Sequence, residues 1–265
     1  MTLVALVREP SASLAECELS YLQRTPIDLG RAREQHAGYC AALRAAGAEV
    51  RVLPALDHLP DAAFVEDTAV VVDEVVVLGA PGPGSRAAEV DAITAALEAH
   101  RRVRRLDRPG AILEGGDVLR IGRTLWVGRS RRTNDAGIEA LRGHLAPLGY
   151  EVRVLPVEGC LHLKTGCSSA GEGIVVVNPD WVDGRYFERE GLGVVTVAAS
   201  EPWAANLLRV GDALLMAAGH RTTAARLREV GLAPVEVEIG EFQKAEAGLT
   251  CLSLLIPGAQ SVSAM

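Results

Sequence analysis

The stretch Thr-Ala-Val-Val-Val-Asp-Glu-Val-Val-Val-Leu-Gly, residues 68–79, indicates how this chain folds. Two apolar, mostly β-branched runs flank a two-residue polar turn, a pattern typical of a β-hairpin. Similar pairs of runs occur at 117–128 and 206–216, and the stretch 171–178 supplies a turn and a strand for one more. The sequence therefore predicts four similar units, spaced about 40 to 50 residues apart.

Helices and further strands complete these units. After the hairpins, Ala, Leu and Ile recur at three- and four-residue intervals opposite charged positions, which is typical of amphipathic helices at 86–99, 134–147 and 221–230. Closing strands are predicted at 151–155 and 234–238. The two ends of the chain supply a strand at 3–7, a helix at 31–46, a strand at 49–53 and a strand at 249–256.

These terminal elements make a fifth unit if the first and last strands pair, and the chain then closes into a ring. All-strand propellers lack a helix in every unit, so we predict an α/β ring of strand-strand-helix-strand modules in a single domain, residues 1–265. Two smaller domains are the alternative that chain length leaves open. The Pro/Gly stretch 80–85 is expected to be a flap near a substrate, and the tail after about residue 257 is a candidate for disorder.

Composition excludes several classes of protein. The net charge of −7 and the lack of a long basic tract argue against a nucleic-acid surface. The N-terminus resembles neither a signal peptide nor a membrane span, so we expect a cytoplasmic protein. Five cysteines are an odd number for a disulfide framework and fit a reducing compartment.

Cys251 is a candidate nucleophile. It lies in the apolar run Gly248-Leu-Thr-Cys-Leu-Ser-Leu-Leu-Ile256, predicted to be a buried strand, where a lone cysteine is usually a core residue. Gly248 and Thr250 break the run at the start of the strand, where a side chain can face a cavity. The local sequence alone leaves both interpretations open.

His162 is a candidate acid and base. It lies in Gly159-Cys-Leu-His-Leu-Lys-Thr-Gly-Cys167, where strand alternation predicts His162 and Lys164 on one face. A catalytic histidine needs a carboxylate to orient it, and Glu114, followed by two glycines, offers one. The C-x-H-x4-C spacing of this segment matches no common zinc site, so no metal site is predicted.

Carboxylates gather before the first hairpin, in Pro60-Asp-Ala-Ala-Phe-Val-Glu-Asp-Thr68. Asp61, Glu66 and Asp67 suit a guanidinium group, whose planar set of donors matches several carboxylate acceptors. Surface loop acids are the alternative. Arg86 and Arg132 could bind the carboxylate of an amino-acid ligand, or be surface arginines at helix starts.

Taken together, five motifs resemble dimethylarginine dimethylaminohydrolases of the guanidino-group-modifying (pentein) superfamily: Phe64-Val-Glu-Asp-Thr68, Leu113-Glu-Gly-Gly-Asp117, Arg132-Thr-Asn134, Leu161-His-Leu-Lys-Thr165 and Leu249-Thr-Cys-Leu-Ser253. Their order and spacing agree over nearly the whole chain. The resemblance implies a five-bladed αβ-propeller of ββαβ modules around a central active site. The lead-in Lys244-Ala-Glu-Ala-Gly248 departs from the more Asp- and Gly-rich segment that the resemblance implies.

The resemblance also implies roles for these residues. Cys251 would be the nucleophile, His162 the general acid and base, and Glu114 the group that orients His162. The substrate-binding residues would be Asp61, Glu66 and Asp67 for the guanidinium, and Arg86 and Arg132 for the substrate carboxylate.

The implied reaction is hydrolysis of N-omega,N-omega-dimethyl-L-arginine, and of monomethylarginine, to citrulline and the methylated amine, without metal or organic cofactor. The protein would be a monomer or homodimer. The alternatives are arginine deiminase, agmatine deiminase, amidinotransferase, cysteine peptidase, or a non-catalytic binder of cationic amino acids.

Overall fold

The computed structural model describes residues 3–82, 86–171 and 173–258 of the chain. Part of the predicted flap, residues 83–85, and the predicted tail from residue 259 onward lie outside these ranges. The predictions for the flap and the tail therefore remain predictions.

The described strands form five sheets of three strands each. In order, the sheets are β15 (Leu254–Ile256), β1 (Val4–Arg8) and β2 (Glu49–Leu53); β3 (Ala69–Val71), β4 (Val75–Leu78) and β5 (Arg102–Arg105); β6 (Val118–Ile121), β7 (Thr124–Arg129) and β8 (Glu151–Pro156); β9 (Cys167–Gly171), β10 (Ile174–Val177) and β11 (Gly193–Thr196); and β12 (Leu207–Val210), β13 (Ala213–Ala217) and β14 (Pro234–Val237).

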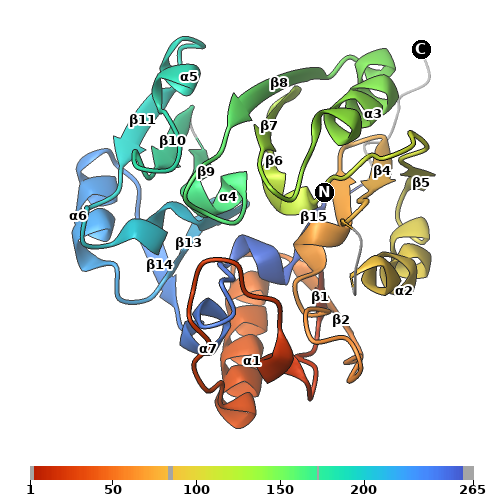
Figure 1. Ribbon diagram of the computed structural model, residues 1–265. Helices are drawn as coiled ribbons and strands as arrows, with labels where there is room; N and C mark the ends of the chain where they lie inside the picture. Colours follow the sequence, from red (N-terminus) through yellow and green to blue (C-terminus); the bar gives the residue numbers. More distant parts are fainter. Residues whose placement is uncertain (1–2, 83–85, 172, 259–265) are drawn as a thin grey trace.

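Every sheet has the same connectivity. The first strand is antiparallel to the middle strand, and the middle strand is parallel to the third. A helix connects each parallel pair and lies toward the periphery in Figure 1, as parallel connections require. These helices are α1 (Leu29–Ala45), α2 (Ala87–Glu98), α3 (Asp135–Leu145), α5 (Arg185–Glu188) and α6 (Arg221–Glu229).

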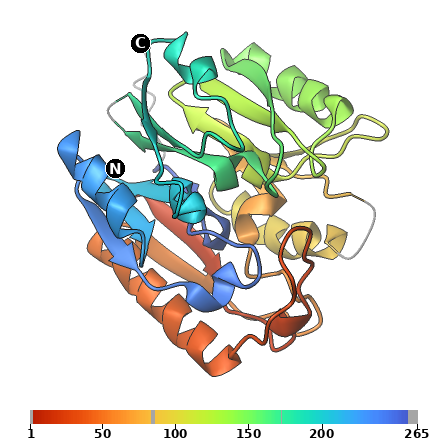
Figure 2. The ribbon, with the colours of Figure 1, turned by 60° about the vertical axis from the view of Figure 1, so that its left-hand side comes forward.

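The two ends of the chain pair, as predicted. Val4 lies opposite Ile256 and Leu6 lies opposite Leu254, so β15 supplies the first strand of the module that β1, α1 and β2 complete. The first and last parts of the chain accordingly lie side by side (Figure 2). The α/β fold with five ββαβ modules is confirmed.

The first strands of the five modules meet around a common centre. A cavity of about 430 Å³ is lined by residues of β3, β6, β9, β12 and β15, together with Glu66, Lys164 and Thr250. Apolar clusters fill the space between and behind the sheets. Segments that precede the first strands therefore converge at the centre of the molecule. They carry the candidate carboxylates, His162 and Cys251, whereas Arg86 follows β4 and Arg132 follows β7.

Two predicted strands have a different structure. Cys251 lies in a 3-10 helix, η6 (Thr250–Leu252), and only the end of the predicted strand 249–256 is extended. Likewise His162 immediately precedes a short helix, α4 (Leu163–Gly166), instead of alternating along a strand with Lys164. Hydrogen bonds to distant residues hold both bends: Thr250 N donates to Asn206 Oδ1 at 3.1 Å, and Leu163 N donates to Asp117 Oδ1 at 2.9 Å.

Several short helices had no counterpart in the sequence analysis. They are α5, α7 (Gly240–Gln243) and the 3-10 helices η1 (Leu14–Glu16), η2 (Val65–Thr68), η3 (Gly115–Asp117), η4 (Ala146–Leu148) and η5 (Pro202–Ala205). Such short turns lack a hydrophobic period long enough to recognise. One of them, η2, carries the candidate site residues Glu66 and Asp67, and Glu114 directly precedes η3.

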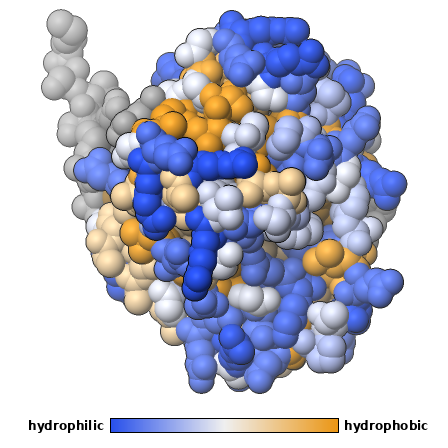
Figure 3. All heavy atoms as spheres, turned by 90° about the vertical axis from the view of Figure 1, so that its left-hand side faces the viewer, coloured by the Kyte–Doolittle hydropathy of each residue, from blue (hydrophilic) through white to orange (hydrophobic). Residues whose placement is uncertain are grey.

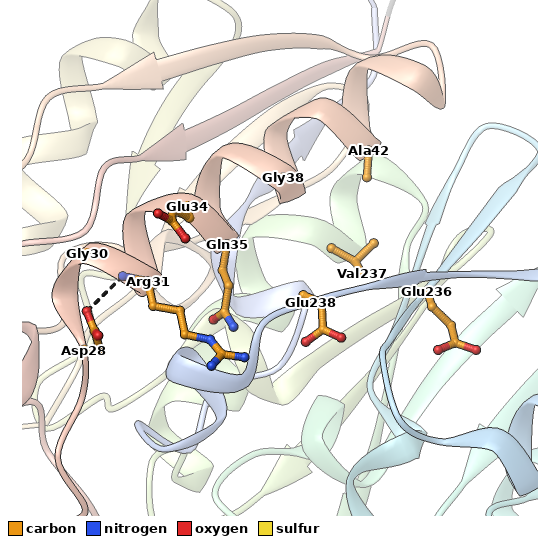
Figure 4. Close-up of a pocket in the computed structure, with 10 residues that line it drawn as sticks. All are labelled: Asp28, Gly30, Arg31, Glu34, Gln35, Gly38, Ala42, Glu236, Val237 and Glu238. Atoms are coloured by element: carbon orange, nitrogen blue, oxygen red, sulfur yellow. Dashed lines mark hydrogen bonds between the residues drawn. The ribbon is translucent and has the colours of Figure 1, made fainter.

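The surface in Figure 3 mixes hydrophilic and hydrophobic residues. An open groove of about 890 Å³ lies between α1 and the end of β14 (Figure 4), and it is largely acidic, with Glu34, Glu236 and Glu238 among its lining residues. None of the candidate site residues lines this groove. No helix in the described part of the chain is long and apolar enough to cross a membrane.

Gly115 is expected to be important for stability, because a side chain does not fit at this position. A Cβ atom at this position would lie 2.0 Å from the carbonyl oxygen of Glu66 and 2.6 Å from that of Ala69, so Gly115→Ala must move backbone. We expect a loss of about 2 kcal/mol or more in the free energy of unfolding. Gly38→Ala is the matched control, because nothing lies within 4 Å of that site in α1, and it should stabilise by about 0.5–1 kcal/mol. Equal effects in urea unfolding would contradict this interpretation.

Candidate active site

His162 and Glu114 form a buried hydrogen-bonded pair. His162 Nε2 lies 2.7 Å from Glu114 Oε2, and the exposed fractions of the two residues are 2% and 0%. Glu114 directly precedes η3, and His162 directly precedes α4. The structure thus brings together two residues that are 48 positions apart, in the relation expected for an oriented acid–base histidine.

Asp67, in η2, supplies a second negative charge to this histidine. Asp67 Oδ1 lies 3.8 Å from His162 Nδ1 and accepts a hydrogen bond from Gly116 N at 3.1 Å. Burial opposes a charge on His162, but Asp67, Glu114 and Asp117 outweigh it and raise the pKa of His162 to about 9. Burial also disfavours the charged form of Asp67, yet the positive His162 and Arg86 bring its pKa to about 2. At neutral pH, His162 is therefore an imidazolium and Asp67 a carboxylate.

Arg86 lies inside this acidic cluster. Its Nη1 atom is 2.8 Å from Asp67 Oδ2 and 3.7 Å from Glu114 Oε2, and its Nη2 atom is 2.9 Å from Glu89 Oε2. Arg86 is buried, and Asp67 and Glu89 raise its pKa further despite the cost of burial. The cluster therefore already binds one guanidinium group, that of Arg86.

Arg132 approaches the other oxygen of Glu114. Arg132 Nη1 lies 3.3 Å from Glu114 Oε1 and 3.2 Å from Glu18 Oε2. Its guanidinium is only partly buried, unlike that of Arg86. Arg132 thus lies between the buried His162–Glu114 pair and the more exposed segment around Glu18.

Cys251 is buried in η6 with a neutral thiol. Burial raises its pKa above the ordinary value, and the negative charges of Glu66 and Asp67 raise it further. Gly248 N donates a hydrogen bond to Cys251 Sγ at 3.4 Å, which favours the thiolate but does not offset the other effects. A thiolate at this position therefore needs an additional positive charge nearby.

Glu66 links the cysteine segment to the histidine segment. Its Oε1 accepts from Lys164 Nζ at 2.5 Å, and its Oε2 accepts from Thr250 Oγ1 at 2.6 Å. Asn206 completes the connection, since its Nδ2 donates to Thr250 Oγ1 at 3.0 Å and to the Lys164 carbonyl at 2.8 Å. These contacts fix the residue before Cys251 relative to α4.

Asp61 is predicted to bind substrate, but it has no ion pair with the other candidate site residues among the described contacts. It is buried, its Oδ2 accepts a hydrogen bond from Glu18 N at 3.2 Å, and burial raises its pKa although Arg86 opposes the shift. Among the predicted site residues, Asp67, Arg86, Glu114, Arg132 and His162 form one connected network of ion pairs.

Sequence reasoning missed several buried residues that support this network. Asp117 accepts from Ser130 Oγ and from Leu163 N, beside His162. Glu89 pairs with Arg86, and burial raises the pKa of Glu89 to about 7. Asp117 ends the motif Leu113-Glu-Gly-Gly-Asp117, so the sequence could have indicated it. The sequence gives no indication that Glu89 supports the site, because charged residues recur along every amphipathic helix.

The donor atoms of Asp67, Glu114 and His162 lie within 4.8 Å of one another, close enough for a metal ion. A cation there would compete with Arg86 for Asp67 and would require loss of the His162 proton. We therefore assign the cluster as an ion-paired site.

The sequence is similar to proteins of one known family. Residues 18–195 match the family model described as N,N dimethylarginine dimethylhydrolase, eukaryotic. A dimethylarginine dimethylaminohydrolase of Streptomyces coelicolor is 40% identical over 94% of this chain and 95% of its own length.

Two solved structures have the same fold. A dimethylarginine dimethylaminohydrolase variant, as an adduct with S-methyl-L-thiocitrulline, superimposes with a TM-score of 0.90 at 27% identity, covering 97% of this chain and all of its own. A Pseudomonas aeruginosa dimethylarginine dimethylaminohydrolase variant in complex with citrulline gives 0.89 at 26% identity and the same coverage.

Five ββαβ modules around a centre that carries acidic, histidine and cysteine side chains define an αβ-propeller of the pentein type. Within that class, the chain belongs to the dimethylarginine dimethylaminohydrolase family.

Proposed function

We propose that this protein hydrolyses N-omega,N-omega-dimethyl-L-arginine, and monomethylarginine, to L-citrulline and dimethylamine or methylamine. The observation that carries the proposal is the buried His162–Glu114 pair beside Asp67. Asp67 already holds the guanidinium of Arg86. A site that stabilises one guanidinium and holds a protonated acid next to it suits cleavage of a substituted guanidinium. The family relationship supports the same reaction.

In the proposed mechanism, Cys251 is the nucleophile and the substrate cation helps to ionise it. A guanidinium near Cys251 offsets the negative charges of Glu66 and Asp67, which hold the thiol neutral. The thiol proton passes to solvent, because His162 already carries a proton, and the thiolate attacks the central guanidinium carbon to form a carbon–sulfur bond. His162 gives its proton to the dimethylamino nitrogen, the carbon–nitrogen bond breaks, and dimethylamine leaves.

Hydrolysis of the thiouronium then completes the reaction. His162, now neutral, takes a proton from water as the water oxygen bonds to the carbon. The carbon–sulfur bond breaks and its electron pair returns to Cys251, which takes the proton left on the water-derived oxygen, and citrulline is released. Glu114 keeps the His162 ring in place during both proton transfers, through the 2.7 Å hydrogen bond.

Asp61, Glu66 and Asp67 are proposed to hold the substrate cation, and Arg86 and Arg132 its carboxylate. Glu66 shares its oxygens with Lys164 and Thr250, so its contribution to the substrate would be mainly through charge. Arg86 would need to exchange Asp67 or Glu89 for the substrate carboxylate. We further propose a single-domain cytoplasmic protein, monomeric or homodimeric, in keeping with its five free cysteines.

Incubation with single guanidine compounds tests the function. We expect asymmetric dimethylarginine to yield equal amounts of citrulline and dimethylamine, with arginine and agmatine turned over at least about 100-fold less efficiently by kcat/KM. Ammonia release from arginine or agmatine would instead indicate a deiminase, and transfer of the amidino group to an added amine would indicate an amidinotransferase. Binding without turnover of any guanidine would overturn the proposal in favour of a binder.

A further inference from the structure

Glu246 has an unusual backbone conformation. Its φ angle is 60°, and within residues 3–82, 86–171 and 173–258 it is the one non-glycine residue with a positive φ. An L-residue in this region costs on the order of 1–2 kcal/mol relative to the right-handed conformation. Such strain persists where surrounding contacts hold it. Glu246 lies five positions before Cys251, so the strain falls in the segment that leads to the candidate nucleophile.

The contacts that hold Glu246 come from the opposite end of the sequence. Its buried carboxylate accepts hydrogen bonds from three consecutive backbone amides: Ser20 N at 3.0 Å, Tyr21 N at 2.5 Å and Leu22 N at 2.6 Å. Hydrogen bonds to a charged acceptor are about twice as strong as neutral ones. Three donors on one carboxylate therefore fix the position of segment 18–22 relative to the segment before Cys251.

Segment 18–22 also contacts two residues of the candidate site. Glu18 N donates to Asp61 Oδ2 at 3.2 Å, and Glu18 Oε2 pairs with Arg132 Nη1 at 3.2 Å. The side chains of Tyr21 and Leu22 are exposed by 39% and 37%, so apolar burial contributes little at this end of the segment. Its position there depends on the polar contacts with Glu246.

We propose that Glu246 is a positioning residue that holds segment 18–22 against Asp61 and Arg132 and thereby sets the affinity for substrate. The proposal rests on the proposed function for the identity of the substrate. It accounts for a strained glutamate at this position: a glycine would adopt the same φ without strain, but it would lack the carboxylate that the three amides require.

Glu246→Gly separates this role from a contribution to folding. Glycine relieves the backbone strain and so partly offsets the loss of the three hydrogen bonds. The melting temperature should therefore fall only modestly, while KM for dimethylarginine should rise about 10-fold or more with kcat nearly unchanged. Glu246→Gln keeps one carbonyl acceptor without the charge and should have an intermediate KM. A lower melting temperature with unchanged KM in both variants would overturn the proposal.

Glu201→Gln is the matched control. Glu201 also accepts from consecutive backbone amides, Thr222 N at 2.9 Å and Thr223 N at 2.8 Å, and it has no place in the candidate site. Its replacement should leave KM unchanged. An equal rise in KM in the control would assign the effect to a general loosening of the fold, against a specific role for Glu246.

Hydrogen exchange of the amides of Ser20, Tyr21 and Leu22 gives a readout that needs no substrate. We expect exchange at these amides to be at least about 10-fold faster in Glu246→Gly than in wild type, and unchanged in Glu201→Gln. Unchanged exchange in Glu246→Gly would contradict the positioning role of Glu246, whichever substrate the enzyme acts on. If the wild type turns over no guanidine, the proposed function fails, and exchange alone decides whether Glu246 holds the segment.

Discussion

Replacement of Cys251 by Ser is expected to lower the turnover of dimethylarginine by at least about 10⁴-fold, because a serine hydroxyl is a far weaker nucleophile than a thiolate and a much weaker acid. The fold should remain intact. Serine is close to cysteine in size, and its hydroxyl can accept the hydrogen bond that Gly248 N donates to Cys251 Sγ. Substrate affinity should change little, since the carboxylates and arginines are untouched.

The measurement is citrulline release under single-turnover conditions, with mass spectrometry of acid-quenched protein. Wild type should show a covalent adduct on the peptide that contains Cys251, and Cys251→Ser should show none. Cys40→Ser, a buried cysteine of α1 that contacts His36, is the control and should retain both activity and adduct. Turnover of Cys251→Ser within about tenfold of wild type would remove Cys251 as the nucleophile.

The fold was predictable because its information is local and repeated. The hairpins, such as residues 68–79, combine short apolar runs with a turn, and three of them are followed by a predicted amphipathic helix. Repetition made every unit support the assignment of the others. Closure followed from two terminal strands, 3–7 and 249–256, that otherwise had no partner, and β1 does pair with β15.

Prediction failed where distant contacts override local pattern. The run from Gly248 to Ile256 reads as one strand, yet Asn206, 44 positions from Thr250, bonds the Thr250 backbone and side chain and bends the chain into η6. Likewise, Asp117 caps the backbone at Leu163, so His162 precedes a helix. Neither bend changes the hydrophobic period, so single-sequence reasoning had no signal for it.

The candidate site was predictable in residue type more than in pairing. Clustered carboxylates before a buried strand, such as Asp67, suggested a cation, and the structure places Arg86 beside them. The partner of Glu66 was not predictable, because Lys164 lies 98 positions away. Spatial pairing of this kind depends on how the modules close into a ring.

His162→Gln is expected to lower kcat by about 10²–10⁴-fold, because the proton for the leaving amine and the base for water are both lost. The same substitution should reveal a pH-dependent contribution to stability. Asp67 and the hydrogen bond to Glu114 outweigh burial and raise the pKa of His162 to about 9, above the ordinary 6.5. Since the folded state holds this proton more tightly, the stabilisation is fully present below about pH 6.5 and is lost as pH rises through about 9.

Chemical unfolding of wild type and His162→Gln across this pH range isolates the effect, because other titrating groups largely cancel in the difference. The advantage of wild type should shrink by on the order of 3 kcal/mol between about pH 6 and pH 10. Glu114→Gln should bring the loss to lower pH, since it removes the negative charge at His162 Nε2 while Asp67 remains. A difference that is flat with pH would mean that folding does not raise the pKa of His162, which would then be largely neutral above about pH 7. The proton for the leaving amine would then have to come from another group.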